Sequence, residues 1–188
     1  MKHHNSTENK PKLTPVKVPW QISSAVPAVK LTVYAEARVV IEFAAIIWHE
    51  AKGAKQSVED KTYDQFEERI IVTFEHAFWV RVHPTISDAE PIDYEKYDTS
   101  ALGPLHINSK EAYTYLDEYR TKWLTSGICP DSGMYEVEGS DWIPSEDAFL
   151  KDGYKHYLLV GQELYYDIFG KKWQWSSEGT INGLSKNG

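Results

Sequence analysis

His156 and Asp167 are the two residues of this chain whose types and spacing best suit catalysis. They lie on either side of a β-hairpin predicted over residues 154–169, whose two-residue turn we place at Gly161-Gln162. That turn would set the two side chains directly opposite each other, with Cβ atoms about 5 Å apart. A turn one residue later would shift the register and still leave both on the same face.

A carboxylate beside an imidazole orients the ring and stabilises its protonated form, which is how a general base is prepared. One hypothesis is therefore a hydrolase or a small-ligand binder that uses the His156 and Asp167 face together with Tyr165. The alternative is a cross-strand polar pair with a purely structural role. The sequence places no Ser or Cys nucleophile near the pair, which favours the structural alternative.

The other candidate residues carry less chemistry. His49-Glu50 begins like a zinc-protease helix, but the position of the second histidine is Gly53. Cys129 follows a predicted helix C-terminus and precedes Asp131, and both features disfavour a thiolate. His76 lies on a predicted apolar strand face and is interpreted as a core histidine. Phosphate-binding loops, nucleophile elbows and dinucleotide fingerprints are absent from the sequence. We predict no metal and no cofactor.

Acidic and aromatic residues are interleaved in the second half of the chain, within an overall charge of −8. This charge disfavours binding to nucleic acid and docking on anionic lipid, and it suits a basic protein partner. Acids set among aromatic side chains are typical of a protein interface with charge-steered association. The predicted interface comprises Tyr135, Asp141, Trp142, Glu146 and Asp147.

The elements that must position these residues are mostly strands. The aromatic share of 13% favours a sheet. Period-2 alternation predicts strands over residues 30–43, 69–83, 134–137 and 154–169, the last of them central to the sheet. Residues 44–54 could form a helical turn, 57–68 a short helix or a loop, and 84–107 a loop.

One strand and one helix are predicted in more detail. In the second strand the even-numbered residues should face the core: Ile70, Val72, Phe74, His76, Phe78, Val80 and Val82. A helix should span residues 109–126, with Asn108 and Glu111 as a capping box, Gly127 as its C-terminal cap, and a stripe of Ala112, Leu116, Tyr119 and Trp123. The sequence thus predicts an α+β fold, a largely antiparallel sheet with one main amphipathic helix packed on a face.

The domain organisation follows from composition. We predict a disordered arm over residues 1–19, a single α+β domain over 20–176, and a flexible tail over 177–188. The first residues lack the apolar segment of a secretory signal, and no apolar stretch reaches the roughly 18 residues that span a bilayer. A cytoplasmic protein is therefore expected. The oligomeric state is left open.

The segment from Trp123 to Val137, followed by Lys155 to Gly161, resembles a pattern in small bacterial domains. Some proteins of this kind are similar to immunity proteins that neutralise polymorphic toxins. The resemblance implies a protein-binding, toxin-immunity-like module, and it carries over no active site, because its residues are turn and core types. Such a module, without enzymatic activity, is the leading prediction from the sequence.

Overall fold

The computed structural model describes residues 10–23, 29–50, 63–86, 91–102, 110–142 and 151–181. The α+β class is confirmed, because one eight-stranded, mostly antiparallel sheet accompanies a single α-helix, α1 (Lys110–Ser126), among these residues. The strands are β1 (Lys12–Pro15), β2 (Trp20–Ile22), β3 (Lys30–Val33), β4 (Val39–Glu50), β5 (Tyr63–Pro84), β6 (Met134–Glu138), β7 (Lys155–Val160) and β8 (Leu164–Thr180). Two short 3₁₀ turns, η1 (Ala35–Ala37) and η2 (Tyr94–Lys96), complete the described elements.

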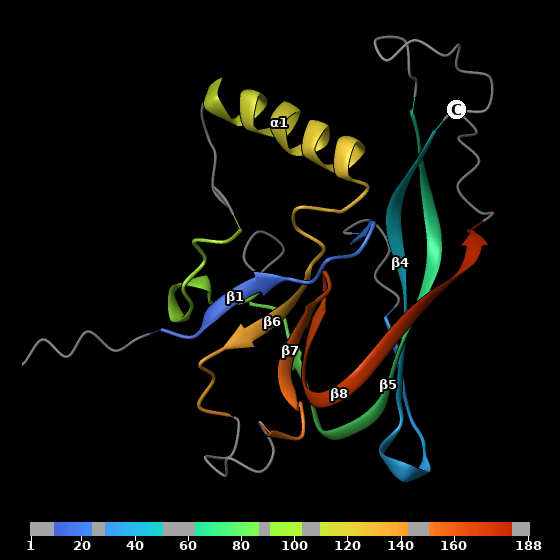
Figure 1. Cartoon of the computed structure of the whole chain (residues 1–188), viewed down its shortest axis with the longest axis vertical. Coiled ribbons are helices and arrows are strands. Elements are labelled where there is room, and N and C mark those ends of the chain that lie inside the picture. Colours follow the sequence, from blue (N-terminus) through green and yellow to red (C-terminus); the bar gives the residue numbers. More distant parts are fainter. Residues whose placement is uncertain are drawn as a thin grey trace, which may run out of the picture.

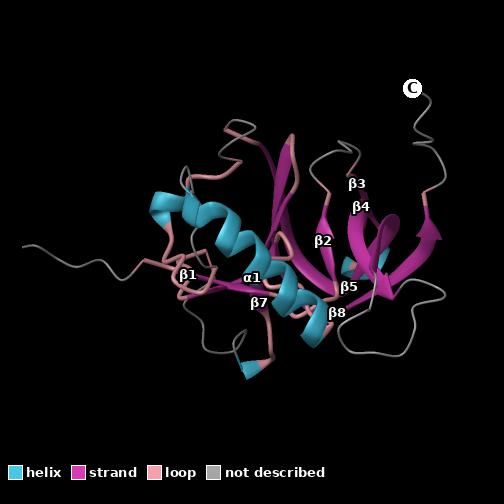
Figure 2. Cartoon of the chain, turned by 90° about the horizontal axis from the view of Figure 1, so that it is seen from above, coloured by secondary structure: helices cyan, strands magenta, loops and turns pink. Residues whose placement is uncertain are grey.

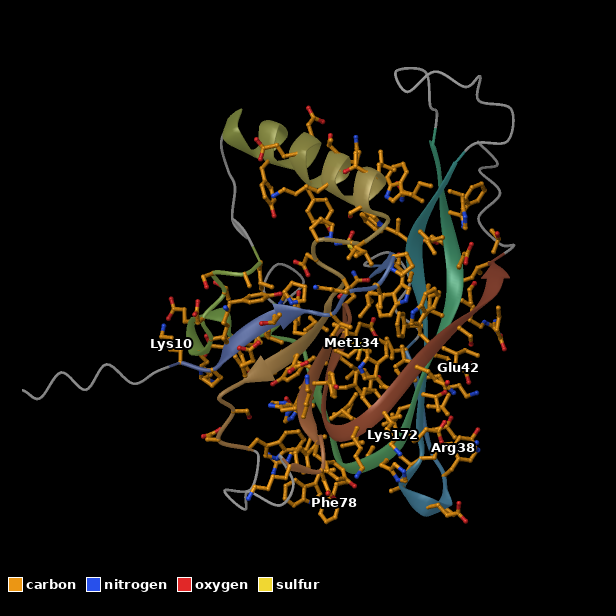
Figure 3. The ribbon with its side chains drawn as sticks, viewed as in Figure 1. Lys10, Arg38, Glu42, Phe78, Met134 and Lys172 are labelled. Atoms are coloured by element: carbon orange, nitrogen blue, oxygen red, sulfur yellow. The ribbon has the colours of Figure 1, made fainter. Side chains whose placement is uncertain are left out.

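The strand order is β1-β6-β7-β8-β5-β4-β2, and β3 also pairs with β4. The predicted central position of the β7–β8 hairpin is thus confirmed. The two longest strands, β5 and β8, bend sharply together, so that the sheet has one arm built on β1, β6 and β7 and another built on β4 (Figure 1). At the bend Gly170 pairs with Ala77, and Phe78 is an extra residue in β5, which makes a β-bulge. Figure 3 shows Phe78 at the lower end of the molecule, below this bend.

Two hydrophobic clusters stabilise the two faces of the sheet. The larger cluster lies between the arms, around Met134 (Figure 3), and draws on six strands, with Trp20, Phe74, Leu159 and Ile168 among its fully buried members. The smaller cluster lies on the opposite face of the β1–β6–β7 arm. It comprises Leu13, Ile92, Leu102, Tyr135, Val137, Leu158 and Val160. The predicted division of the hairpin side chains between two faces is confirmed, because Tyr157 and Leu159 join the first cluster and Leu158 and Val160 the second.

The helix ends as predicted, at Gly127, whose φ of 67° suits the C-terminal cap. Its buried stripe differs from the prediction, since Leu116 is 53% exposed while Tyr115, Tyr119 and Trp123 face inward. Trp123 is the main anchor: its Nε1 donates to the Pro19 carbonyl and its ring packs edge-on against Trp48. Figure 2 shows α1 crossing the β1–β7 end of the sheet. The capping box at Asn108 and the side chains of Glu111 and Ala112 lie outside the described residues.

Several local predictions were wrong because long strands override weak local preferences. Residues 44–50 continue β4 as a strand, and residues 63–68 begin β5, so neither stretch is helical where it is described. On β5 the predicted alternation holds for Ile70, Val72 and Phe74 and then fails around the bulge, where Ala77 is buried and His76, Phe78 and Val82 are exposed. His76 is therefore not a core histidine.

The described sheet also extends into both predicted tails. Lys12–Pro15 pairs with β6, and Leu13 is fully buried. At the other end β8 continues to Thr180.

Candidate functional site

The β7–β8 hairpin brings His156 and Asp167 together through a turn one residue later than our first choice, which shifts the strand register by two residues. The turn falls at Gln162-Glu163, because Gly161 donates its main-chain N–H to the Leu164 carbonyl and Val160 pairs with Tyr165. Asp167 therefore lies opposite Leu158, and His156 lies opposite Phe169. The two side chains meet on the diagonal of the strand pair, which is still within reach of long side chains.

His156 is buried, with only 5% of the residue exposed, and both of its ring nitrogens have hydrogen-bond partners. Its Nε2 lies 2.8 Å from Asp167 Oδ1, and its Nδ1 lies 2.7 Å from Ser140 Oγ. Ser140 follows β6 in a turn in which Gly139 has φ +72°, and its Oγ accepts the Trp142 main-chain N–H at 3.2 Å. In the tautomer that carries its proton on Nε2, the ring donates to Asp167 and its Nδ1 can accept the Ser140 hydroxyl proton.

Asp167 is shared between two histidines. Its second oxygen, Oδ2, lies 3.0 Å from His83 Nε2 on β5. This contact does not meet hydrogen-bond geometry, and the buried His83 Nε2 has no other hydrogen-bond partner in the described part of the chain. His83 in turn stacks on Tyr165 with ring centroids 4.7 Å apart and planes within 13°. The four polar side chains Ser140, His156, Asp167 and His83 thus form one continuous network across β6, β7, β8 and β5.

Aromatic packing fixes the outer side of the network. Trp142 packs edge-on against the His156 ring with centroids 4.7 Å apart, and the Arg81 guanidinium lies 4.8 Å from the Trp142 ring centroid. The Trp79 ring packs against the same indole, with ring centroids 6.2 Å apart. The ring of His156 therefore has little freedom to leave its hydrogen-bonded position.

The network opens into a cleft of about 700 Å³, within the size range of small-molecule sites. The lining residues come from several separate parts of the chain: Lys10, Pro11, Arg81, Lys96, Tyr97, Val137, Gly139, Ser140, Asp141, Trp142, His156 and Asp167. Burial, followed by the negative charges of Asp167 and its neighbours, raises the pKa of Tyr97 to about 12. The Tyr97 phenol therefore stays protonated at neutral pH and can donate a hydrogen bond.

The predicted interface residues are not all placed at the surface. Asp141 is exposed and Trp142 partly exposed, and both line this cleft. Tyr135 is only 2% exposed, and its hydroxyl donates to Asp131 Oδ1 at 2.7 Å. It therefore offers no ring to a partner from this position. Glu146 and Asp147 lie outside the described residues.

Sequence reasoning missed Ser140, the one hydroxyl nucleophile in the network. The missing signal was the pairing of β6 with β7, in which Glu136 lies opposite Tyr157, the neighbour of His156, and Ser140 follows four residues later. Cys129, by contrast, is 2% exposed, and burial raises the pKa of its thiol to about 12. This agrees with the prediction that it does not act as a thiolate. Within the described residues no group of three or more His, Cys, Asp or Glu side chains is arranged to hold a metal ion.

Comparison of the chain with family models, with curated proteins and with solved structures found no match. The resemblance to immunity proteins therefore stays a prediction. The described part of the chain contains no helix with the length and hydropathy of a membrane span.

Proposed function

We propose that the protein is a small-molecule hydrolase whose reacting group is Ser140, with His156 as general base and Asp167 as the residue that orients the base. The observation that carries the proposal is the unbroken series of contacts Ser140 Oγ–His156 Nδ1–His156 Nε2–Asp167 Oδ1, at 2.7 and 2.8 Å, on the wall of a ligand-sized cleft. A nucleophile, a base and an orienting carboxylate in hydrogen-bond contact are the groups that acyl transfer requires.

The proposed reaction is hydrolysis of an ester in two steps. His156 Nδ1 takes the hydroxyl proton of Ser140 while Oγ bonds to the carbonyl carbon, and the leaving alcohol takes the proton back from Nδ1 as the C–O bond breaks. Water then attacks the acyl-serine by the same route and releases the acid. Asp167 keeps the proton on Nε2 and stabilises the imidazolium that forms in each step. The neutral hydroxyl of Tyr97, which lines the same cleft, is a candidate donor to the carbonyl oxygen.

The test is covalent labelling followed by kinetics. A fluorophosphonate probe should label the wild-type protein at one site, Ser140, identified by peptide mass spectrometry. Hydrolysis of a panel of 4-nitrophenyl esters should fall by at least about 100-fold in Ser140→Ala and His156→Gln. The control is Ser126→Ala, which removes an exposed hydroxyl bonded to main-chain groups at the helix end.

Two results would contradict the proposal: label distributed equally over Ser140→Ala and wild type, or ester turnover that survives both substitutions. Unfolding curves must accompany the kinetics, because a large loss of stability in His156→Gln with no measurable wild-type turnover would assign the network a structural role.

A second candidate function is the binding of a basic protein, as the immunity-like resemblance implies. What favours it is the exposed carboxylate of Asp141 beside the partly exposed ring of Trp142 in an acidic protein. Capture from the native lysate at low and high salt should then recover a stoichiometric basic partner that is lost at high salt. Charge reversal at Asp141 and Glu146 should weaken that association and flatten its salt dependence; unchanged affinity would rule this candidate out.

A further inference from the structure

We propose that the ligand of this cleft carries a negatively charged group, a carboxylate or a phosphate, which Arg81 binds with help from Lys96 and Lys10. This inference rests on the proposed function for the reaction, though the binding it describes does not depend on Ser140. It is drawn from the charges that line the cleft and from the position of Arg81 over the Trp142 ring, which contacts His156.

The cleft lining has more cationic than anionic side chains, whereas the protein as a whole is acidic. The chain has a net charge of −8, yet the lining includes three cations, Lys10, Arg81 and Lys96, against two carboxylates, Asp141 and Asp167. Asp167 is engaged by two histidines, and the Lys96 pair with Asp93 at 3.3 Å is an exposed contact that contributes little. Within the described residues Arg81 forms no ion pair with a carboxylate, although Asp167 lies opposite it in the β5–β8 pairing. A local excess of positive charge in an acidic protein favours anion binding in the cleft.

The hydrogen-bonding groups give the same preference. Arg81 and the two lysines can only donate, and the Tyr97 phenol is neutral and free to donate at ordinary pH. A ligand with several acceptor oxygens would satisfy this set, whereas an amine would leave it unsatisfied.

The stacking of Arg81 relates the anion subsite to the reacting group. The guanidinium lies 4.8 Å from the Trp142 centroid, and the same indole contacts the His156 ring at 4.7 Å. An arginine over an aromatic ring can still direct its N–H groups to a bidentate contact with carboxylate or phosphate. In a ligand anchored there, the uncharged end would extend past the Trp142 indole toward His156 and Ser140.

The kinetic test compares an anionic ester with a neutral one of similar length, the 4-nitrophenyl monoester of succinic acid and 4-nitrophenyl butyrate. Arg81→Gln should lower kcat/KM for the anionic ester by about 10- to 100-fold more than it lowers kcat/KM for the neutral ester. Arg81→Lys should restore only a fraction of the loss, because lysine lacks the planar fork. The matched control is Arg38→Gln, since Arg38 is also stacked on an aromatic ring, Tyr34, at 4.3 Å. Arg38 and Lys10 lie on opposite sides of the molecule in Figure 3.

A binding test separates this inference from the proposed reaction. Succinate and inorganic phosphate are titrated into the protein while the indole N–H signals are followed by NMR, at low and at high salt. Binding should weaken with salt, be lost in Arg81→Gln, persist in Ser140→Ala and Arg38→Gln, and strengthen in Asp141→Asn.

The two proposals can fail separately. Anion binding that Arg81→Gln abolishes, in a protein that turns over no ester, would support the anion site and refute the hydrolase. Equal affinity in wild type and Arg81→Gln, or no shift with either anion, would overturn the anion site whatever the outcome of the ester assays.

Discussion

A side chain at Gly170 should destabilise the protein, because Gly170 lies where the two central strands bend. A Cβ atom added to Gly170 would lie 2.9 Å from the His76 carbonyl oxygen, 3.2 Å from Phe74 Cδ1 and 3.3 Å from Ala77 Cα. Two of these three atoms belong to the backbone of β5, beside the bulge at Phe78. The crowding therefore cannot be relieved by rotating a side chain, and the strands themselves must move apart.

The expected magnitude for Gly170→Ala is the difference between two effects. Overpacking at a buried site costs about 1–3 kcal/mol. The loss of glycine's freedom in the unfolded chain contributes about 0.4–1 kcal/mol in the opposite direction, and it applies in full because the φ of Gly170 does not lie in the left-handed region. We expect a net loss of about 1–2 kcal/mol in the free energy of unfolding, or roughly 2–8 °C in Tm for a chain of this size.

Urea unfolding followed by tryptophan fluorescence and far-UV circular dichroism would measure the loss. Gly153→Ala is the comparison: Gly153 has φ +79° with no atom within 4 Å of an added Cβ, so that its cost of about 1 kcal/mol comes from backbone strain alone. Amide shifts in Gly170→Ala should concentrate on Phe74 to Ala77. A Gly170→Ala protein as stable as wild type, or more stable, would refute the reasoning, because it would mean that the strands yield at no cost.

Two further predictions concern the buried groups behind the helix. Cys129 should react with a disulfide reagent at pH 8 orders of magnitude more slowly in the native protein than in guanidinium chloride, because burial raises the pKa of its thiol to about 12; fast native labelling would contradict this. Burial also raises the pKa of Asp131 above 3.8. Because the folded protein holds this proton more tightly than the unfolded chain, the free energy of unfolding falls as pH rises from about 4. Asp131→Asn keeps the acceptor for the Tyr135 hydroxyl without the charge, so its stability relative to wild type in urea unfolding should increase between pH 4 and pH 7; a constant difference would count against it.

The features that the sequence predicted well are those that depend on alternation alone. The two faces of the β7–β8 hairpin came out correctly although the turn was placed one residue early, because a turn at either place keeps His156 and Asp167 on one face. The end of α1 at Gly127 was likewise a local property, since the residue needs a positive φ. In both cases the interaction that decides the structure lies within a few residues.

The features that could not be predicted depend on strand neighbours far away in the sequence. Lys12–Pro15 looks like a segment of a polar arm, and only its pairing with β6 buries Leu13. The pattern of apolar residues at even positions of β5 gives no sign of the bulge, which occurs where β5 meets Gly170 of β8. The buried stripe of α1 shifted from Leu116 to Tyr115 because the hydroxyl of that tyrosine reaches the Leu102 carbonyl.

Two of the four network residues in the candidate site could be predicted from the sequence, because only those two lie on strands adjacent in the chain. His156 and Asp167 lie on adjacent strands, whereas Ser140 and His83 reach them only through the strand order β6-β7-β8-β5. That order places four polar side chains beside the apolar cluster of Leu158, Val160 and Val137. Replacing a satisfied buried polar network by apolar side chains of similar volume is often neutral or stabilising. Stability therefore gives no reason for a histidine with both ring nitrogens engaged at this place. Departures from the apolar pattern of a sheet are expected at functional sites, and this one occurs on the wall of a cleft, so a test of reactivity at Ser140 is the direct way to decide what the network does.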